Sequence, residues 1–489
     1  MVNTNDRAAI EEPQLDTTPP SIPSDALKAS VSDDDVRAFY ERMQWKGLWS
    51  PATTTALDQA LGSRIRNGLD RVDYGKVDDS MSPADRDVAR TKAALSYAKS
   101  LARGRVDPSD LHEVYTLQES QVDVAAGLAQ ALEQNQVAHF FAGLVPQDDD
   151  YRRLSEAYVR YAREGRQASS SKLDDKDTIH VGDRDPRVSE IARQLAANGY
   201  LSQDNVPAGG EQAAQYTQPI AEGVKRLQAD YGIKTDGLFG GDTLAVINIG
   251  PADKARALAV ALERRRWLSR TPPATRIDVN AAAATLDYHR DGKLVDQRRV
   301  IVGQPDRETP PLGSPLYRLV ANPTWTVPKS IEVSSATVRA KNMHKVNGYW
   351  VQPSGPDNAL GLVKFDMQNK QAIYLHDTSD KSLFDRTQRD LSHGCVRVQD
   401  ALGFAQMIAQ QEGVADKWKQ ARASGEQTFV DLPAPIPVRL LYQNAFIDKK
   451  GEVVFRTDPY GWNDTVARRL GFDGGAAKKA RSDDIDLGP

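Results

Sequence analysis

Cysteine is the scarcest residue type in this 489-residue chain, which has one, Cys395. A single cysteine excludes an internal disulfide framework. It leaves two interpretations: a small buried hydrophobic side chain, which is the commoner case, or a nucleophilic thiol with a histidine nearby in the fold. Scarcity of cysteine is also compatible with an oxidising compartment, where spare thiols pair wrongly.

Long apolar runs and an excess of basic charge are missing too. The chain is 40% hydrophobic and 27% charged, which is enough to build several cores, yet no continuous apolar stretch is long enough to span a bilayer. The formal net charge is -4, whereas a nucleic-acid-binding surface needs a basic face. The composition therefore predicts no transmembrane segment in this chain and no nucleic-acid partner.

The N-terminus lacks the basic stretch followed by an apolar segment that marks a signal peptide. Residues 1–33 are instead rich in Pro, Ser, Thr and Asp, which predicts a disordered leader. Either the protein is cytoplasmic, or a targeting segment has been removed upstream.

Hydrophobic periodicity divides the rest of the chain and predicts a multi-domain α+β protein. Apolar residues recur at helical spacing in the first third, and β-branched residues with period two dominate after residue 275. A long irregular segment inside the β region predicts a capping loop. The predicted parts are a helical scaffold domain (34–166), a polar linker (167–181), a three-helix module (182–249), a connecting helix (250–274), a mostly β domain (275–432) with its capping region at about 331–362, a C-terminal β extension (433–473) and a disordered tail (474–489).

The module at 182–249 resembles the peptidoglycan-binding domain family, a small three-helix module. Two amphipathic helices are followed by a glycine-flanked turn, TDGLFGGDT. Most of the matching positions are of types that also serve a core or a turn, so the fold is better supported than glycan binding. The matching residues are Val224, Leu227, Gln228, Gly232, Asp236, Gly237, Phe239, Gly240 and Thr243.

Cys395 lies in the segment IYLHDTSDKSLFDRTQRDLSHGCVRVQD, residues 373–400. His393 precedes it by two positions, and His376 ends the apolar strand that begins at Ile373. A thiol is mostly protonated at neutral pH, so a nucleophilic cysteine needs a base or a cation nearby. We therefore predict Cys395 as nucleophile and His376 as its base, with the intervening polar loop bringing the two together.

The neighbours of Cys395 support the same chemistry. Gly394 removes a side chain next to the thiol, so that a substrate carbonyl can approach the backbone amides of His393 to Cys395, which are natural oxyanion donors. Arg397 projects to the same side as Cys395 if the segment is extended, and there it would receive a substrate carboxylate.

Each of these residues also has another explanation. His376 alone fits a hydrogen-bonded histidine at a strand end, and Arg397 alone fits a solvated surface residue. A metal site of His376, His393 and Cys395 is a third interpretation, but the spacing lacks the paired ligands of ordinary zinc sites and a fourth ligand. Their convergence at the only cysteine favours catalysis without a metal or cofactor.

His376 and the hexapeptide SHGCVR, residues 392–397, together resemble the signature of L,D-transpeptidases with a YkuD-type catalytic domain. The resemblance extends to the large, multi-domain Gram-negative (YcbB-like) branch and spans most of the chain outside its two tails. The segments that carry it are VIVGQPDRETP, ANPTWTVPKSI, QPSGPDNALGLVKFDMQN, IYLHDTSDKSLFDR, the N-terminal helical region and the C-terminal VRLLYQNAFIDKKGEVVFRTDPYG.

This resemblance implies that Cys395 attacks the third residue of a tetrapeptide stem, releases D-alanine, and passes the thioester to the side-chain amine of another stem. His376 would accept the thiol proton. Ser392 and the carbonyl of Asp377 are candidates to orient its imidazole. The motif residues His393 and Gly394 complete the predicted catalytic set, and Arg397, Tyr374, Asn358 and Trp350 are the candidate substrate contacts, with packing the commoner role for the last three.

The implied partners are the stem peptides and glycan of peptidoglycan, which lie outside the cytoplasm. The resemblance therefore implies a periplasmic protein whose targeting segment was removed upstream. The capping region is short for this branch, which bears on how the lid closes and on acceptor preference. An L,D-carboxypeptidase, an enzyme that attaches or releases a wall-linked protein, and a non-catalytic wall-binding scaffold stay open as alternatives, and the sequence does not predict an oligomeric state.

Overall fold

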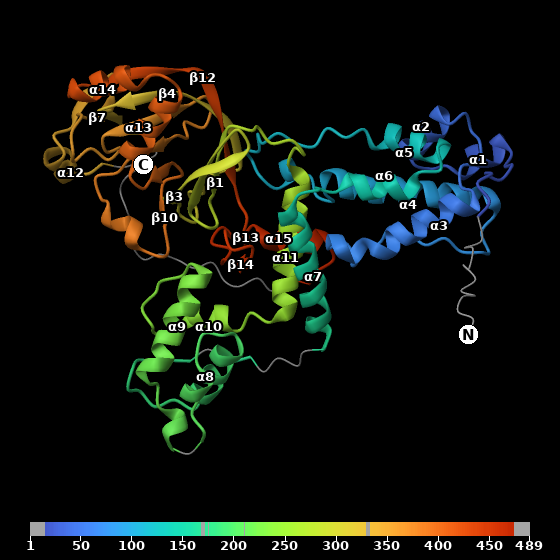
Figure 1. Cartoon of the computed structure of the whole chain (residues 1–489), viewed down its shortest axis with the longest axis horizontal. Coiled ribbons are helices and arrows are strands. Elements are labelled where there is room, and N and C mark those ends of the chain that lie inside the picture. The colour runs from blue at the N-terminus through green and yellow to red at the C-terminus, as the bar shows by residue number, and fades with distance from the viewer. Residues whose placement is uncertain (1–14, 168–171, 175, 210, 329–332, 474–489) are drawn as a thin grey trace, which may run out of the picture. The chain divides into compact units, whose positions relative to one another are not determined.

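A computed structural model describes residues 15–167, 172–174, 176–209, 211–328 and 333–473, and divides into two compact units. The first unit comprises residues up to 105 together with 120–148, and the second comprises 106–119 together with the rest of the chain from 149. The predicted α+β multi-domain class is confirmed: the first unit is helical, and the second combines helices with a large sheet (Figure 1). The tail from residue 474 lies outside the described residues.

The helices of the first unit begin at clear capping residues. The side chains of Asp33, Ser50, Ser82 and Asp123 each accept a hydrogen bond from a backbone N–H in the first turn that follows. Pro follows directly at the start of two of these helices, where its missing N–H costs nothing. The helices of this unit are α1 (Ser24–Ser30), α2 (Asp34–Arg42), α3 (Pro51–Gly62), α4 (Pro83–Arg103), α5 (Val124–Glu133) and α6 (Val137–Leu144).

Helix α1 corrects the prediction of a disordered leader at 1–33. Residues 1–14 lie outside the described part, but Ser24–Ser30 forms a helix packed on α4. Leu27 is fully buried and Val31 nearly so. Two apolar side chains are thus enough to anchor a segment whose composition alone predicts disorder.

A buried carboxylate organises the first unit. Asp87 of α4 is 2% exposed and accepts hydrogen bonds from the Tyr40 hydroxyl and from the backbone N–H groups of Leu48 and Trp49. Burial raises the pKa of this carboxyl, while these hydrogen bonds oppose the shift. Asp87 therefore fixes the loop between α2 and α3 against α4.

Two long helices of the second unit flank the three-helix module. Helix α7 (Asp149–Gln167) packs on α11 (Pro251–Trp267), so α7, which we had assigned to the scaffold segment, belongs to the second unit. A Cβ added at Gly165 would lie 2.9 Å from the Cα of Ala252, so the end of α7 lies directly against the start of α11. The helices between them are α8 (Val188–Ala197), α9 (Gln218–Tyr231) and α10 (Gly241–Ile247), drawn in green in Figure 1.

Gln228 is the hydrogen-bonding centre of this module. Its Nε2 donates to Asp236 Oδ1 (3.0 Å) and to Thr243 Oγ1 (2.9 Å), and its Oε1 accepts from the N–H of Gly237 (2.9 Å). These four residues belong to the motif found in the sequence, and here they hold the turn to the helix. The predicted linker ends in the same core, because Ile179 is buried and pairs with Phe239.

The large sheet of the second unit closes on itself. Strand order is β10-β3-β11-β9-β8-β4-β12-β1-β2, and β3 also pairs with β2. The first part of β3 pairs with β2, and its last part pairs with β11 and β10. Its strands are β1 (Arg276–Asn280), β2 (Thr285–Arg290), β3 (Lys293–Gly303), β4 (Leu312–Ala321), β8 (Val363–Met367), β9 (Leu375–His376), β10 (Asp390–Ser392), β11 (Val396–Val398) and β12 (Thr428–Leu441).

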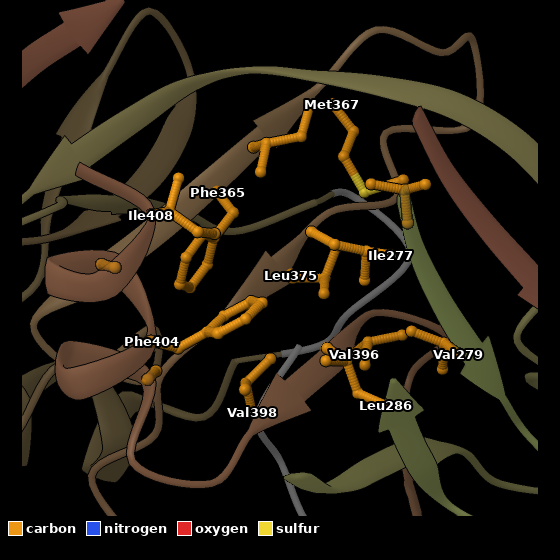
Figure 2. Close-up of a cluster of buried hydrophobic side chains, with 14 of the residues drawn as sticks. Ile277, Val279, Leu286, Phe365, Met367, Leu375, Val396, Val398, Phe404 and Ile408 are labelled. Carbon is orange, nitrogen blue, oxygen red and sulfur yellow. The ribbon is translucent and has the colours of Figure 1, made fainter. Parts of the chain in front are cut away.

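One face of these strands packs on helix α13 (Ala401–Gln411), and α14 (Ala415–Ala423) follows it. Figure 2 shows Phe404 and Ile408 of α13 beside Phe365, Leu375 and the valines of β11. The Phe365 and Phe404 ring centroids are 5.5 Å apart. This core holds β8, β9 and β11 rigidly, and the catalytic motif lies on β9 and directly before β11.

The capping region is more regular than predicted. Within about 331–362, the structure has a helix, α12 (Ser335–Ala340), and two strands, β6 (His344–Val346) and β7 (Tyr349–Gln352), which form a small sheet with β5 (Trp325–Thr326). These elements are too short to give a periodic sequence signal. Part of the cap, residues 329–332, lies outside the described residues.

The predicted boundary after residue 432 falls inside β12, which continues to Leu441 between β4 and β1. The pairing of β12 with β4 is interrupted between Asp431 and Ile436, where Pro433 and Pro435 remove backbone donors. The prolines therefore mark an irregularity within one strand. The hairpin β13 (Ala445–Ile447) and β14 (Val453–Phe455) and the helix α15 (Asn463–Arg469) follow.

Candidate active site

Adjacent parallel strands bring the predicted nucleophile and base together. Cys395 directly precedes β11, which pairs with β9 in the register Val396 with Leu375 and Arg397 with His376. The backbone N–H of Val396 donates to the carbonyl of Tyr374 (3.1 Å). His376 and the cysteine motif are therefore neighbours in the sheet, although a long polar loop separates them in sequence.

The thiol is buried and poorly ionised at rest. Cys395 is 7% exposed, and its Sγ lies 3.7 Å from the carbonyl of Ala372. Burial raises the pKa of the thiol to about 11, while hydrogen bonds from Tyr374 and the positive charges of Lys364 and Arg397 oppose this shift. At neutral pH the thiol therefore needs a base to become a nucleophile.

Three basic side chains occupy neighbouring positions across the strands. Lys364 of β8 pairs in register with His376 of β9, which pairs with Arg397 of β11. The Lys364 ammonium lies 4.3 Å from the Tyr374 ring centroid and 2.7 Å from Asp366 Oδ1. The Tyr374 and His376 ring centroids are 5.6 Å apart. The positive charges of Lys364 and Arg397 favour a developing thiolate, although Asp366 pairs with Lys364 and burial outweighs both charges.

The tight turn before Cys395 depends on Ser392 and Gly394. Gly394 has a φ of +107°, a conformation that favours glycine. The Ser392 hydroxyl donates to the Cys395 carbonyl (2.6 Å) and accepts from the Gly394 N–H (3.2 Å). The Gly394 amide is therefore engaged within the turn, which corrects its assignment to the oxyanion donors. The role of Ser392 at the imidazole stays a prediction, because these two hydrogen bonds instead brace the turn.

A buried relay fixes the peptide that precedes Cys395. Thr309 is 1% exposed, and its Oγ1 donates to the Gly394 carbonyl (2.9 Å) while accepting from the Gly303 N–H (2.9 Å). The Tyr460 hydroxyl donates to the Gly303 carbonyl (2.7 Å) and accepts from the Thr309 N–H (3.3 Å). Because a peptide group is planar, holding the Gly394 carbonyl also sets the direction of the Cys395 N–H, which is a candidate oxyanion donor next to the thiol.

Of the predicted substrate contacts, Arg397 and Tyr374 lie near the thiol, whereas Asn358 lies within the cap. Arg397 is 1% exposed and lies beside His376 in the sheet, which excludes the alternative of a solvated surface residue, while its role as a contact for a substrate carboxylate stays a prediction. Tyr374 lies against both Cys395 and the cap. Asn358 is buried, and its amide is engaged by the backbone of Gln352, Pro353 and Leu360, so it braces the cap.

Trp350 belongs to β7 and packs on the core of the cap, with Lys345 5.0 Å from its ring centroid. Thr309 and Lys364 were missed by the sequence analysis. The alternation of VKFDM in β8 was a signal for Lys364, because it predicts that this side chain leaves the apolar face. The position of Thr309 depends on contacts that no local pattern reveals.

The described residues contain no group of three or more His, Cys, Asp or Glu side chains placed to hold a metal ion. Nor do they include a helix that is both long and apolar enough to cross a membrane.

Family comparisons agree with the geometry. The model of the "L,D-transpeptidase catalytic domain" family matches residues 274–426. A "Scaffold domain" model matches 34–158, and a "Putative peptidoglycan binding domain" model matches 184–247. Residues 274–426 are a YkuD-type L,D-transpeptidase domain. The resemblance found in the sequence is thereby confirmed for this domain and for the peptidoglycan-binding module, while membership of the YcbB-like branch stays a prediction.

Relatives of the L,D-transpeptidase domain are distant. The chain is 32% identical over 221 residues to a Haemophilus influenzae protein named "Putative L,D-transpeptidase"; the match covers 38% of this chain and 44% of that protein. It is similar to the L,D-transpeptidase structure from Stackebrandtia nassauensis, with 15% identity, coverage of 56% and 97% and a TM-score of 0.22. A Mycobacterium smegmatis L,D-transpeptidase gives 14% identity, coverage of 35% and 60% and a TM-score of 0.21, and neither structural score carries an argument here.

Proposed function

We propose that this protein is a peptidoglycan L,D-transpeptidase that works through a Cys395 thioester. The observation that carries the proposal is the register of β9 and β11, which sets His376 beside the turn that presents the chain's only cysteine. The L,D-transpeptidase and peptidoglycan-binding modules support peptidoglycan as the substrate. Such a substrate also supports an extracytoplasmic, periplasmic location.

In the proposed reaction, His376 takes the thiol proton while Sγ bonds to the carbonyl carbon of the third stem residue. The carbonyl oxygen gains negative charge next to the Cys395 N–H. Collapse breaks the bond to the terminal D-alanine, whose amine leaves with the proton from His376. The amine of a second stem then attacks the thioester carbonyl and gives a proton to His376. The C–S bond breaks as the new amide forms, and His376 returns the proton to the Cys395 thiolate.

The deciding experiment is intact-protein mass spectrometry after brief mixing with a disaccharide-tetrapeptide, using wild type and Cys395→Ala side by side. We expect a mass gain equal to the donor minus D-alanine on wild type alone. An absence of adduct together with an absence of released D-alanine would contradict the proposal. Product analysis with and without an added amine acceptor then separates cross-linking from hydrolysis.

A further inference from the structure

A second polar cavity, of about 240 Å³, lies within the second unit and shares no lining residue with the thiol site. Its walls are the loop between β1 and β2, the start of β10, the segment after β14 and the end of α9. The loop contributes four consecutive alanines, Ala281 to Ala284, whose small side chains leave the space open. Gln388 and Thr387 add polar groups.

Three arginines line this cavity, and most of their hydrogen bonds go to neutral groups. Arg389 donates to the main-chain carbonyls of Val300 (3.1 Å), Arg386 (2.8 Å), Thr387 (3.2 Å) and Ala284 (3.1 Å). Arg456 donates to the carbonyls of Asp230 and Phe455. Arg299 donates to the Phe384 carbonyl and lies 4.0 Å from the exposed Asp385.

Carbonyl partners satisfy N–H groups but balance no charge. The nearby carboxylates are Asp230 and Asp448 for Arg456 and Asp385 for Arg299. The pKa of Arg389 is accordingly lowered to about 10, first by burial and then by the charges of Arg299 and Arg456. The Arg389 guanidinium is thus close enough to those of Arg299 and Arg456 to be repelled by both, and an anion beside it would relieve that repulsion.

An unpartnered carboxyl oxygen of Asp390 also points to a ligand in this cavity, independently of the arginines. It is 6% exposed, it is the one acidic residue among those that line the cavity, and its Oδ2 has no hydrogen-bond partner in the described part of the chain. Burial raises the pKa of this carboxyl to about 7, so a large fraction is protonated at neutral pH. A buried polar atom without a partner is costly, and a ligand would supply the missing hydrogen bond.

We propose that this cavity binds a carboxylate of a peptidoglycan stem peptide, with the arginines receiving the carboxylate and Asp390 pairing with an adjoining amide. The inference rests on the proposed function and names a second contact for its substrate. Asp390 and Cys395 are five residues apart, which limits their separation to about 18 Å, comparable to the length of an extended stem peptide. Ala229 and Gly232 of the peptidoglycan-binding module also line the cavity, so the bound stem would contact that module as well.

Binding of a disaccharide-tetrapeptide to the full Cys395→Ala chain, measured by titration calorimetry, tests the proposal. The cavity variant is Arg299→Gln with Arg456→Gln, and the matched control is Arg318→Gln, whose exposed ion pair with Asp431 lies on β4 and β12 outside the cavity. We expect the cavity variant to bind at least about tenfold more weakly, because charge-assisted hydrogen bonds are lost. The control should bind like the parent.

A second variant, Ala282→Leu, fills the cavity and keeps every charge, so it separates loss of the site from loss of the fold. It should weaken binding to a similar degree while leaving the circular dichroism spectrum unchanged. A probe with amidated carboxylates should bind the parent as weakly as the free-acid probe binds the cavity variant. Equal affinity of both cavity variants and the parent for the free-acid probe would overturn the proposal.

Inorganic phosphate serves as the competing anion. If phosphate binds in the cavity while the amidated and free-acid stems bind alike, the stem assignment is wrong. The thioester assay on protein with intact Cys395 reports separately on the proposed function. If the thioester forms but the cavity variants bind the stem as well as the parent does, the cavity proposal is wrong and the proposed function stands. If the cavity variants bind more weakly but no thioester forms, the transpeptidase proposal is wrong and the binding site stands.

Discussion

At the scale of single residues, the chemistry depends on how a buried thiol becomes a nucleophile. Burial favours the neutral form of Cys395, and the nearby positive charges of Lys364 and Arg397 oppose this only in part. His376 is fully buried and neighbours the cysteine motif in the sheet. Proton transfer to His376 would thus generate the thiolate, which the nearby positive charges alone do not stabilise enough at neutral pH.

For His376→Ala, we expect severe loss of thioester formation at neutral pH and recovery as the pH rises. Without a base, the rate should follow the thiolate fraction, which grows about tenfold per pH unit below the thiol pKa of about 11. Stopped-flow or quenched mass spectrometry across pH 7 to 10 measures this. A flat pH profile would argue that His376 is not the base.

Lys364→Met tests the positive field. Removing this charge should raise the pKa of the Cys395 thiol, because the thiolate loses a stabilising cation. In the His376→Ala background, the rise of activity should therefore move to higher pH. The matched control, Lys370→Met, removes an exposed lysine of the same region and should leave the profile in place.

Residue roles could be predicted only where the motif itself carries the chemistry. Cys395 and His376 could be proposed as nucleophile and base from one short segment, and the structure brings that segment and His376 together in the sheet. Asn358 was not, because its amide is consumed by backbone atoms of its own loop. The same holds for Ser392, whose hydroxyl binds the turn that it belongs to.

At the scale of elements, period-two patterns predicted β1, β2 and most of β4, because these strands have one face on the core. In β3 the first seven residues are not buried and the last four are all buried, so its apolar run VIVG was the signal there. The cap was missed as a structured element, since strands of two to four residues leave no periodic trace. The prolines of β12 suggested a domain boundary after residue 432, but they mark a bulge within a strand that continues to Leu441. Element boundaries are thus set by tertiary pairing that local sequence does not show.

The relay through Thr309 makes the turn before Cys395 a testable element. Thr309→Val keeps the shape of the side chain but removes the hydrogen bond to the Gly394 carbonyl. We expect kcat for thioester formation to fall about tenfold with little change in KM, because the Cys395 N–H loses its fixed direction. Thr309→Ser should restore most of the rate. A fall in both variants, or a rise in KM alone, would point to a packing role.

At the scale of the whole molecule, the chain consists of two compact units whose division cuts across the predicted helical domain. The helical spacing found in the first third of the chain includes both α4 and α7, yet α4 belongs to the first unit and α7 to the second. Periodicity shows that a helix has an apolar face, but it does not show which partner covers that face.

The two units should unfold as separate transitions in calorimetry, since each has its own core. Asp87→Ala should lower the free energy of unfolding of the first unit alone, by about 3 kcal/mol. The N–H groups of Leu48 and Trp49 and the Tyr40 hydroxyl lose their acceptor in this variant. Thioester formation at 25 °C reports on the second unit as the control. A single transition shifted as a whole would show that the units unfold together.

The close approach of Gly165 to Ala252 has a consequence for the ancestry of the chain. Everything between these two residues, including the peptidoglycan-binding module, leaves and re-enters the helical pair α7 and α11 at nearly one point. A segment attached in this way can be gained, lost or exchanged without disturbing the helices that carry it. The peptidoglycan-binding module is thus an insertion whose contacts with the sheet domain, rather than its chain connections, limit how far it can diversify.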